Sequence, residues 1–127
     1  MNPLTRAALL TLCLLTLSTP LHASKPWLQK VPARDHTRSN PLAGNPDAVS
    51  AGHLLYQNRC AQCHGANALG RGRYPSMRSD RVQQLATPGD LHWLLVNGHL
   101  TAGMPEWSKM PDPQLWQIVA YLKSLHQ

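Results

Sequence analysis

Two cysteines and a histidine stand together in the segment Cys60-Ala61-Gln62-Cys63-His64. Each thiol can add to one vinyl group of a haem, and the two-residue gap lets both sulfurs reach neighbouring vinyl groups. The histidine that follows the second cysteine then falls beneath the iron, where its ring can bind as the proximal ligand. This spacing predicts a haem attached covalently through Cys60 and Cys63, with His64 as an iron ligand.

A Cys-x-x-Cys pair also occurs in three other kinds of site. A zinc site needs about four ligands, whereas the only further cysteine is Cys13, near the N-terminus. A thioredoxin-like pair would stand in a βαβ pattern, and no such pattern surrounds the motif. A structural disulfide would close a small ring. We therefore prefer the haem, and keep a non-haem dithiol redox module as an alternative.

Residues 1–23 have the features of a secretory signal peptide. Arg6 supplies the charged start, residues 7–17 form a short apolar stretch, and Leu21-His22-Ala23 ends in a small residue suited to cleavage. The apolar stretch is too short to span a bilayer comfortably. We therefore expect export, cleavage after Ala23 and no stable membrane span afterwards. An uncleaved anchor is the alternative.

The composition indicates a fold that depends on a bound group. The chain of 127 residues suffices for one domain, but it has no phenylalanine, and aromatic residues make up only 6% of it. A core of side chains alone would be thin, and a large apolar macrocycle would supply the missing bulk. Because a ligand that binds only the native state stabilises that state by mass action, we expect the folded state to depend on haem.

Three expected helices begin with a capping side chain followed by proline: Asn45-Pro46, Thr87-Pro88-Gly89-Asp90 and Asp112-Pro113. The first helix runs into Cys60, and the second ends at Gly98. No alternation typical of strands and no internal repeat accompany these patterns. The sequence therefore predicts an all-α class.

The remaining segments give weaker signals. Residues 79–85 suggest a short helix with Ser79 as its cap. Glycines make residues 65–77 a loop. Three prolines punctuate residues 24–45, which we expect to be an irregular Pro-rich N-terminal extension of the domain.

Over about residues 46–125 the chain resembles the class I c-type cytochromes. The resemblance implies a cytochrome c-like fold of three to five helices around one covalently bound haem c, in a domain of residues 46–127. It also implies that the first helix crosses the last one, with Gly52 allowing close approach. The residues that carry the resemblance are Gly52, Tyr56, Cys60, Cys63, His64, Gly65, Gly70, Gly98, Gly103, Met104, Pro105, Trp107, Trp116, Tyr121 and Leu122.

A second iron ligand is expected in the segment Gly103-Met104-Pro105, which resembles the Gly-Met-Pro of the family. A thioether ligand closes the iron to substrates and raises the potential. Met104 follows His64 after a helix long enough to cross a haem, and Pro105 stiffens its loop. Met77 is more typical of packing on the side of His64, Met110 before the last helix is either exposed or packed, and His99 is the strongest rival ligand.

Pro75 is the candidate for a supporting role at the first ligand. In similar cytochromes a proline carbonyl in this loop accepts a hydrogen bond from the second ring nitrogen of the ligating histidine, which fixes the tautomer. The alternative is an ordinary turn proline.

The expected function is that of a periplasmic one-electron carrier with His64 and Met104 as axial ligands of the haem iron. Such a protein needs no catalytic base or nucleophile, so it is not expected to be an enzyme, although it can serve as the cytochrome subunit of an oxidoreductase complex. The alternative function is a haem-based ligand-binding sensor or small peroxidase with an open or displaceable sixth site.

The partners expected are redox proteins, such as a periplasmic dehydrogenase, oxidase or reductase. The formal net charge is +6. This charge does not indicate a nucleic-acid partner, because the chain is expected to be exported and lacks a nucleic-acid motif. Five arginines near the haem motif would steer acidic partners or pair with haem propionates; a solvated basic face is equally compatible. They are Arg59, Arg71, Arg73, Arg78 and Arg81.

Overall fold

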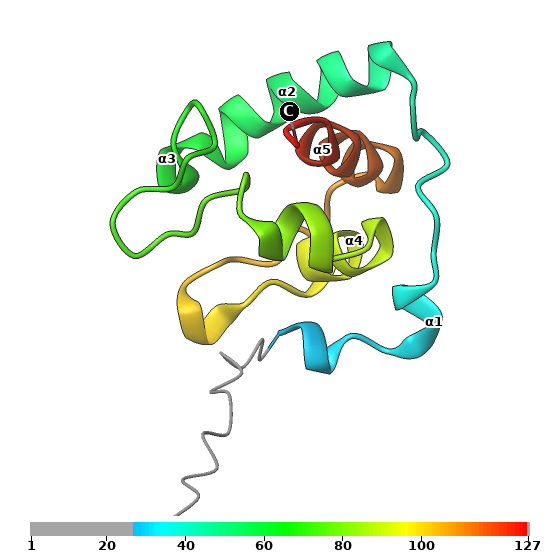
Figure 1. The fold of residues 1–127 in the computed structure, drawn as a ribbon, viewed down its shortest axis with the longest axis horizontal. Helices are drawn as coiled ribbons and strands as arrows, with labels where there is room; N and C mark the ends of the chain where they lie inside the picture. Colours follow the sequence, from blue (N-terminus) through cyan, green and yellow to red (C-terminus); the bar gives the residue numbers. More distant parts are fainter. Residues whose placement is uncertain (1–26, 127) are drawn as a thin grey trace, which may run out of the picture.

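The computed structural model describes residues 27–126, and the expected signal peptide lies outside this range. In these residues it contains five α-helices, three single helical turns and no strand, which confirms the all-α class (Figure 1). No helix there is long and apolar enough to cross a membrane. The elements are η1 (Leu28–Lys30), α1 (Ala33–His36), α2 (Pro46–Arg59), α3 (Ala61–His64), η2 (Arg81–Leu85), α4 (Pro88–Asn97), η3 (Leu100–Ala102) and α5 (Asp112–Ser124).

Helices α2 and α5 cross at the main helix–helix contact of the fold (Figure 1). At the crossing, a Cβ added to Gly52 would lie 1.9 Å from the carbonyl oxygen of Gln117. Only glycine lets the two backbones approach so closely. Tyr56, Ile118 and Val119 are each at most 1% exposed beside this crossing. The close approach expected at Gly52 is therefore present.

Local capping explains where α2 and α4 begin. The side-chain oxygen of Asn45 accepts hydrogen bonds from the backbone nitrogens of Asp47 and Ala48, at 2.9 and 3.2 Å. Thr87 and Asp90 form a reciprocal capping box, with bonds of 3.1 and 2.8 Å. Both starts agree with the sequence prediction, and so does the end of α4 at Gly98, whose φ is 68°.

The predicted start of α5 was wrong by one residue. Asp112 was expected as the cap, but it is the first helical residue, and Pro111 holds the capping position. The carboxylate of Asp112 instead accepts a hydrogen bond from His92 Nε2 at 2.7 Å. A tertiary partner has therefore replaced the expected local one.

The predicted short helix at 79–85 was also too long and wrongly capped. A single turn of π-helix begins at Arg81, after Asp80, and no side chain caps it. The ammonium group of Lys123 closes it from α5, donating to the carbonyl oxygens of Val82, Gln83 and Ala86 at 3.0, 2.8 and 2.8 Å.

Residues 27–45, here called the N-terminal strap, are more ordered than expected. They contain η1 and α1 and run along one side of the molecule before α2 (Figure 1). Trp27 is only 8% exposed and belongs to the core. Asn40 is buried and donates from Nδ2 to the carbonyl oxygen of Trp116 at 2.9 Å. The strap is therefore packed onto the helical domain.

Candidate haem site

The haem motif begins at Cys60, the residue between α2 and α3, and its other four residues form the single turn of α3. Cys60 ends α2, and its backbone nitrogen donates to the carbonyl oxygen of Tyr56 at 2.8 Å. Its own carbonyl oxygen accepts from the backbone nitrogen of His64 at 2.9 Å. The two cysteines and the histidine are thus held on one helical turn. Cys60 and Cys63 are both partly buried and are not joined in a disulfide.

Three side chains fasten this turn to its surroundings. The buried hydroxyl of Tyr56 donates to the carbonyl oxygen of Gly65 at 2.8 Å. Gln57 Nε2 donates to the carbonyl oxygen of Ala66 at 2.9 Å, and Arg71 Nη1 donates to that of Gln62 at 3.1 Å. The resemblance pointed to Tyr56, whereas the contacts of Gln57 and Arg71 had no sequence signal.

His64 and Pro75 lie within hydrogen-bond distance, as the sequence analysis expected for this pair. His64 Nδ1 is 2.9 Å from the carbonyl oxygen of Pro75. A carbonyl oxygen can only accept, so Nδ1 carries the proton and Nε2 keeps a lone pair for a metal. Gly70 permits this loop geometry, because its φ is 84° and an added Cβ would lie 2.7 Å from the carbonyl oxygen of Tyr74.

The loop of Met104 is built against the end of α4. Met104 pairs with His99 through two backbone hydrogen bonds of 2.9 and 3.1 Å. Gly98, with φ of 68°, lies so close that an added Cβ would be 2.8 Å from the carbonyl oxygen of Met104. The backbone nitrogen of Trp107 donates to the carbonyl oxygen of Leu95 at 2.8 Å. Met104 is partly buried and packs against the core.

Burial and, to a smaller extent, the neighbouring Cys63 together raise the pKa of the Cys60 thiol to about 11. The unattached thiol is therefore neutral at physiological pH. Desolvation also raises the pKa of Tyr56 well above its usual value of 10, so its hydroxyl remains a donor to Gly65. Neither the Cys60 thiol nor the Tyr56 hydroxyl therefore adds a formal charge to the turn that carries the haem motif, here called the attachment turn.

The residues present match the needs of a covalently bound haem. The turn offers two thiols with a two-residue gap, an imidazole with a free Nε2, and a loop that supplies a thioether. The same residues do not make a zinc site, because within residues 27–126 no three His, Cys, Asp or Glu side chains lie together in a way that could hold a metal ion. Haem is therefore the group that this donor set accommodates.

Comparison with known proteins supports the same conclusion. Residues 47–122, more than half of the chain, match the family described as cytochrome C oxidase, cbb3-type, subunit III. The chain belongs to the class I c-type cytochromes. The domain is therefore a c-type cytochrome of the electron-carrier kind, with covalently bound haem c.

Three relatives illustrate how the cytochrome compares with longer proteins. Cytochrome c550 of Pseudomonas aeruginosa is 32% identical over 109 residues, which cover 80% of this chain and 69% of that protein. Subunit CcoP of the cbb3-type cytochrome c oxidase of Rubrivivax gelatinosus is 47% identical over 85 residues, covering 66% of this chain and 28% of the subunit. Subunit FixP of the cbb3-type oxidase of Sinorhizobium medicae is 34% identical over 89 residues, covering 63% and 31%. The cytochrome thus spans less than a third of the length of these oxidase subunits.

The five arginines near the motif are all exposed. Three of them also make contacts within the protein. Arg71 holds the attachment turn, as described above. Arg78 donates from Nε to the carbonyl oxygen of Asn67 at 3.1 Å and from Nη1 to that of Leu125 at 3.2 Å. The guanidinium carbon of Arg73 lies over the ring of Tyr74, 5.1 Å from the ring centroid. Some of the arginines on this basic surface thus also hold parts of the fold together.

Proposed function

We propose that the cytochrome is an exported one-electron carrier in which His64 and Met104 are the axial ligands of the haem iron. Cys60 and Cys63 provide the thioether bonds. The observation that carries the proposal is the 2.9 Å contact between His64 Nδ1 and the carbonyl oxygen of Pro75. It leaves Nε2 as the only ring nitrogen available to a metal, and it orients the ring.

A bound haem c supplies the one-electron couple of its iron. The residues of the chain keep the ligands in place while the charge changes. Gly70 lets the loop of Pro75 close behind His64, and Gly98 lets the loop of Met104 close against α4. Because both loops are packed without room for a methyl group, the ligands have little freedom to move between the two oxidation states.

Met104 is preferred over His99 for a chemical reason. The Met104 side chain packs against the apolar core. A thioether is buried there without a polar partner, whereas an imidazole would need one. His99 is tied to Met104 through their backbones, so the two residues cannot move independently. Met77 lies in the loop of Pro75, where its backbone nitrogen donates to the carbonyl oxygen of Ala68 at 2.9 Å.

Export to the periplasm follows from the signal features at residues 1–23. Expression of the precursor in a bacterium with haem-attachment machinery, followed by mass spectrometry of the periplasmic protein, tests both steps. We expect a chain that begins at Ser24 and carries the mass of one haem. A haem-free or uncleaved protein would contradict the respective step.

The partners are proposed to be acidic redox proteins, such as a periplasmic dehydrogenase or reductase, or a terminal oxidase of the kind named among the relatives. Exposed arginines would attract them at long range. Rates of electron transfer to an anionic inorganic oxidant should fall with ionic strength, and Arg59→Gln and Arg81→Gln should lower them further. Rates independent of ionic strength would contradict this steering.

Binding of carbon monoxide to the ferrous protein separates an electron carrier from a sensor or small peroxidase. A closed site with Met104 bound predicts little binding, together with one reversible one-electron wave in voltammetry. Rapid and tight binding would contradict the proposal and support the open-site alternative.

A further inference from the structure

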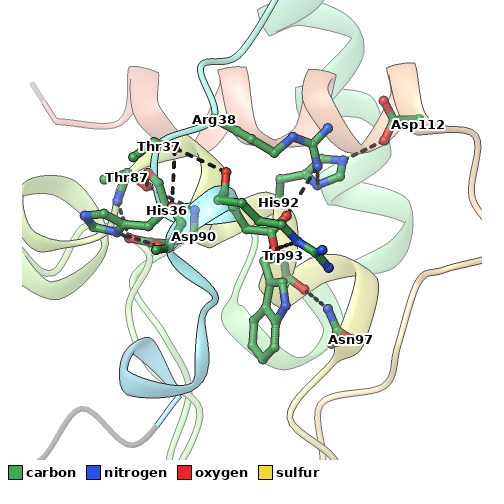
Figure 2. A network of polar contacts seen from close by, with 12 residues as sticks. His36, Thr37, Arg38, Thr87, Asp90, His92, Trp93, Asn97 and Asp112 are labelled. Carbon is green, nitrogen blue, oxygen red and sulfur yellow. Dashed lines mark hydrogen bonds and ion pairs between the residues drawn. The ribbon is translucent and has the colours of Figure 1, made fainter.

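The N-terminal strap is anchored at the start of α4 by a buried carboxylate (Figure 2). His36 Nδ1 lies 2.9 and 3.0 Å from the two carboxylate oxygens of Asp90. The Asp90 side chain is 0% exposed, whereas that of His36 is 55% exposed. The hydroxyl of Thr87 donates to the carbonyl oxygen of His36 at 2.8 Å. A buried carboxylate needs such partners, because an unpaired one would be costly.

A second anchor joins the strap to both α4 and α5 through His92 (Figure 2). Arg38 Nη1 is 3.3 Å from His92 Nδ1, and His92 Nε2 is 2.7 Å from the carboxylate of Asp112. A guanidinium only donates, so His92 is neutral, with its proton on Nε2. The ring of His92 stacks on Trp116 at 4.1 Å, and the guanidinium of Arg38 lies over the same indole at 5.0 Å.

The backbones of α1 and α4 also touch. A Cβ added to Gly89 would lie 1.9 Å from the carbonyl oxygen of Asp35 and 2.9 Å from that of Arg38. The strap therefore fixes the position of the first turn of α4 and does not merely cover it.

The other end of the same helix supports the loop of Met104. Gly98 lies against the backbone of Met104, and Leu95 accepts a hydrogen bond from the backbone of Trp107, as described for the haem site. Helix α4 has ten residues, about 15 Å of rise. It is short and hydrogen-bonded throughout, so its displacement at one end is transmitted to the other.

We propose that the strap is a brace for α4 that determines how firmly the Met104 loop is held, with His36 as a positioning residue. The strap lies outside the family match, which begins at residue 47. The inference rests on the proposed ligation by Met104. It deepens that proposal by adding a remote determinant of ligand stability.

The test compares His36→Ala with His36→Asn in the complete haem-loaded protein. Asn can present an amide donor near the position of Nδ1, so it should restore the bond to Asp90. Ala51→Gly in α2 is the matched control, because it lowers stability through helix propensity at a site remote from α4 in sequence. Two readouts are the displacement of Met104 from the ferric iron by imidazole and the hydrogen-exchange rate of the Trp107 amide.

We expect His36→Ala to tighten apparent imidazole binding and to accelerate Trp107 exchange, each by roughly three- to tenfold, as the loss of one hydrogen bond implies. His36→Asn should reverse most of both changes, and Ala51→Gly should leave imidazole binding within about twofold of wild type. If His36→Ala only lowers the unfolding midpoint, as the control does, the brace is refuted. A wild-type protein without a methionine–iron band would instead refute the ligation by Met104, and Trp107 exchange would still test the coupling through α4.

Discussion

The Nδ1 atom of His64 and the carbonyl oxygen of Pro75 lie 2.9 Å apart, although 11 residues separate them in the chain. The contact assigns the tautomer of the imidazole and leaves Nε2 free for the proposed bond to iron. It depends on the loop between them, which turns back at Gly70. The orientation of the proposed proximal ligand therefore depends on the loop backbone as well as on the histidine.

Replacing Gly70 by alanine tests this dependence. The left-handed φ of 84° and the 2.7 Å clash with the carbonyl oxygen of Tyr74 should together cost about 2–3 kcal/mol of unfolding free energy. Gly72→Ala is the matched control, since its φ is 53° but nothing lies within 4 Å, and it should cost about 1 kcal/mol. Denaturant titration of the haem-loaded variants measures both values. Equal costs would show that the close approach at Gly70 is unimportant.

Gly98 should tolerate a side chain as poorly as Gly70, but its replacement should affect the binding of Met104 to iron. An added Cβ would meet the backbone of Met104, Pro105 and Glu106 within 2.8 Å, so Gly98→Ala should push the loop away and weaken the methionine–iron bond. Imidazole should then displace Met104 at concentrations about tenfold lower. Gly44→Ala, also at a positive φ but without neighbours within 4 Å, should leave this affinity unchanged.

The crossing of α2 and α5 leaves no space for a side chain at Gly52. Gly52→Ala should cost about 3 kcal/mol or more, because backbone at 1.9 Å cannot move aside cheaply. Ser50→Gly, at an exposed position of the same helix, should cost no more than about 1 kcal/mol, through helix propensity and the loss of the exposed hydrogen bond from the Ser50 hydroxyl to the carbonyl oxygen of Pro46. Thermal unfolding of the haem-loaded proteins distinguishes the two, and a stable Gly52→Ala variant would contradict the close crossing.

The neutral state of His92 predicts a dependence of stability on pH. Burial is the main cause that lowers its pKa below the usual 6.5, and the hydrogen bond to Asp112 partly opposes the shift. The unfolded chain therefore takes up the proton first, so the free energy of unfolding should fall as pH drops below about 6.5. Above that pH, His92 should contribute no pH dependence.

His92→Phe keeps an aromatic ring against Trp116 and removes the titrating group. Its unfolding free energy should fall less between pH 7 and pH 5 than that of wild type, as measured by denaturant titrations at each pH. His126→Gln, at an exposed position, serves as the control and should retain the wild-type slope. Parallel slopes for wild type and His92→Phe would contradict the assignment.

Local signals predicted those features of the fold that depend on neighbours in the chain. The caps at Asn45 and Thr87 act on backbone groups two or three residues away, and the haem motif needs only one helical turn. The Pro75 contact was expected from family resemblance, because nothing local pairs Pro75 with His64.

Tertiary contacts explain what the sequence did not predict. The bond between His36 and Asp90 joins residues 54 apart, and Lys123 closes η2 from a distance of about 40 residues. Asp112 had the local pattern of a helix cap, but its carboxylate accepts a hydrogen bond from His92 instead. No periodicity or motif encodes such partners, so the strap was expected to be irregular.

The visible spectrum of the ferric protein tests the central claim, that His64 and Met104 are the two axial ligands, most directly. We predict the weak long-wavelength band of a methionine–iron bond in wild type and its loss in Met104→Ala, with Met110→Ala as a control that retains it. A wild-type spectrum without the band, or a band that survives in Met104→Ala, would contradict the account.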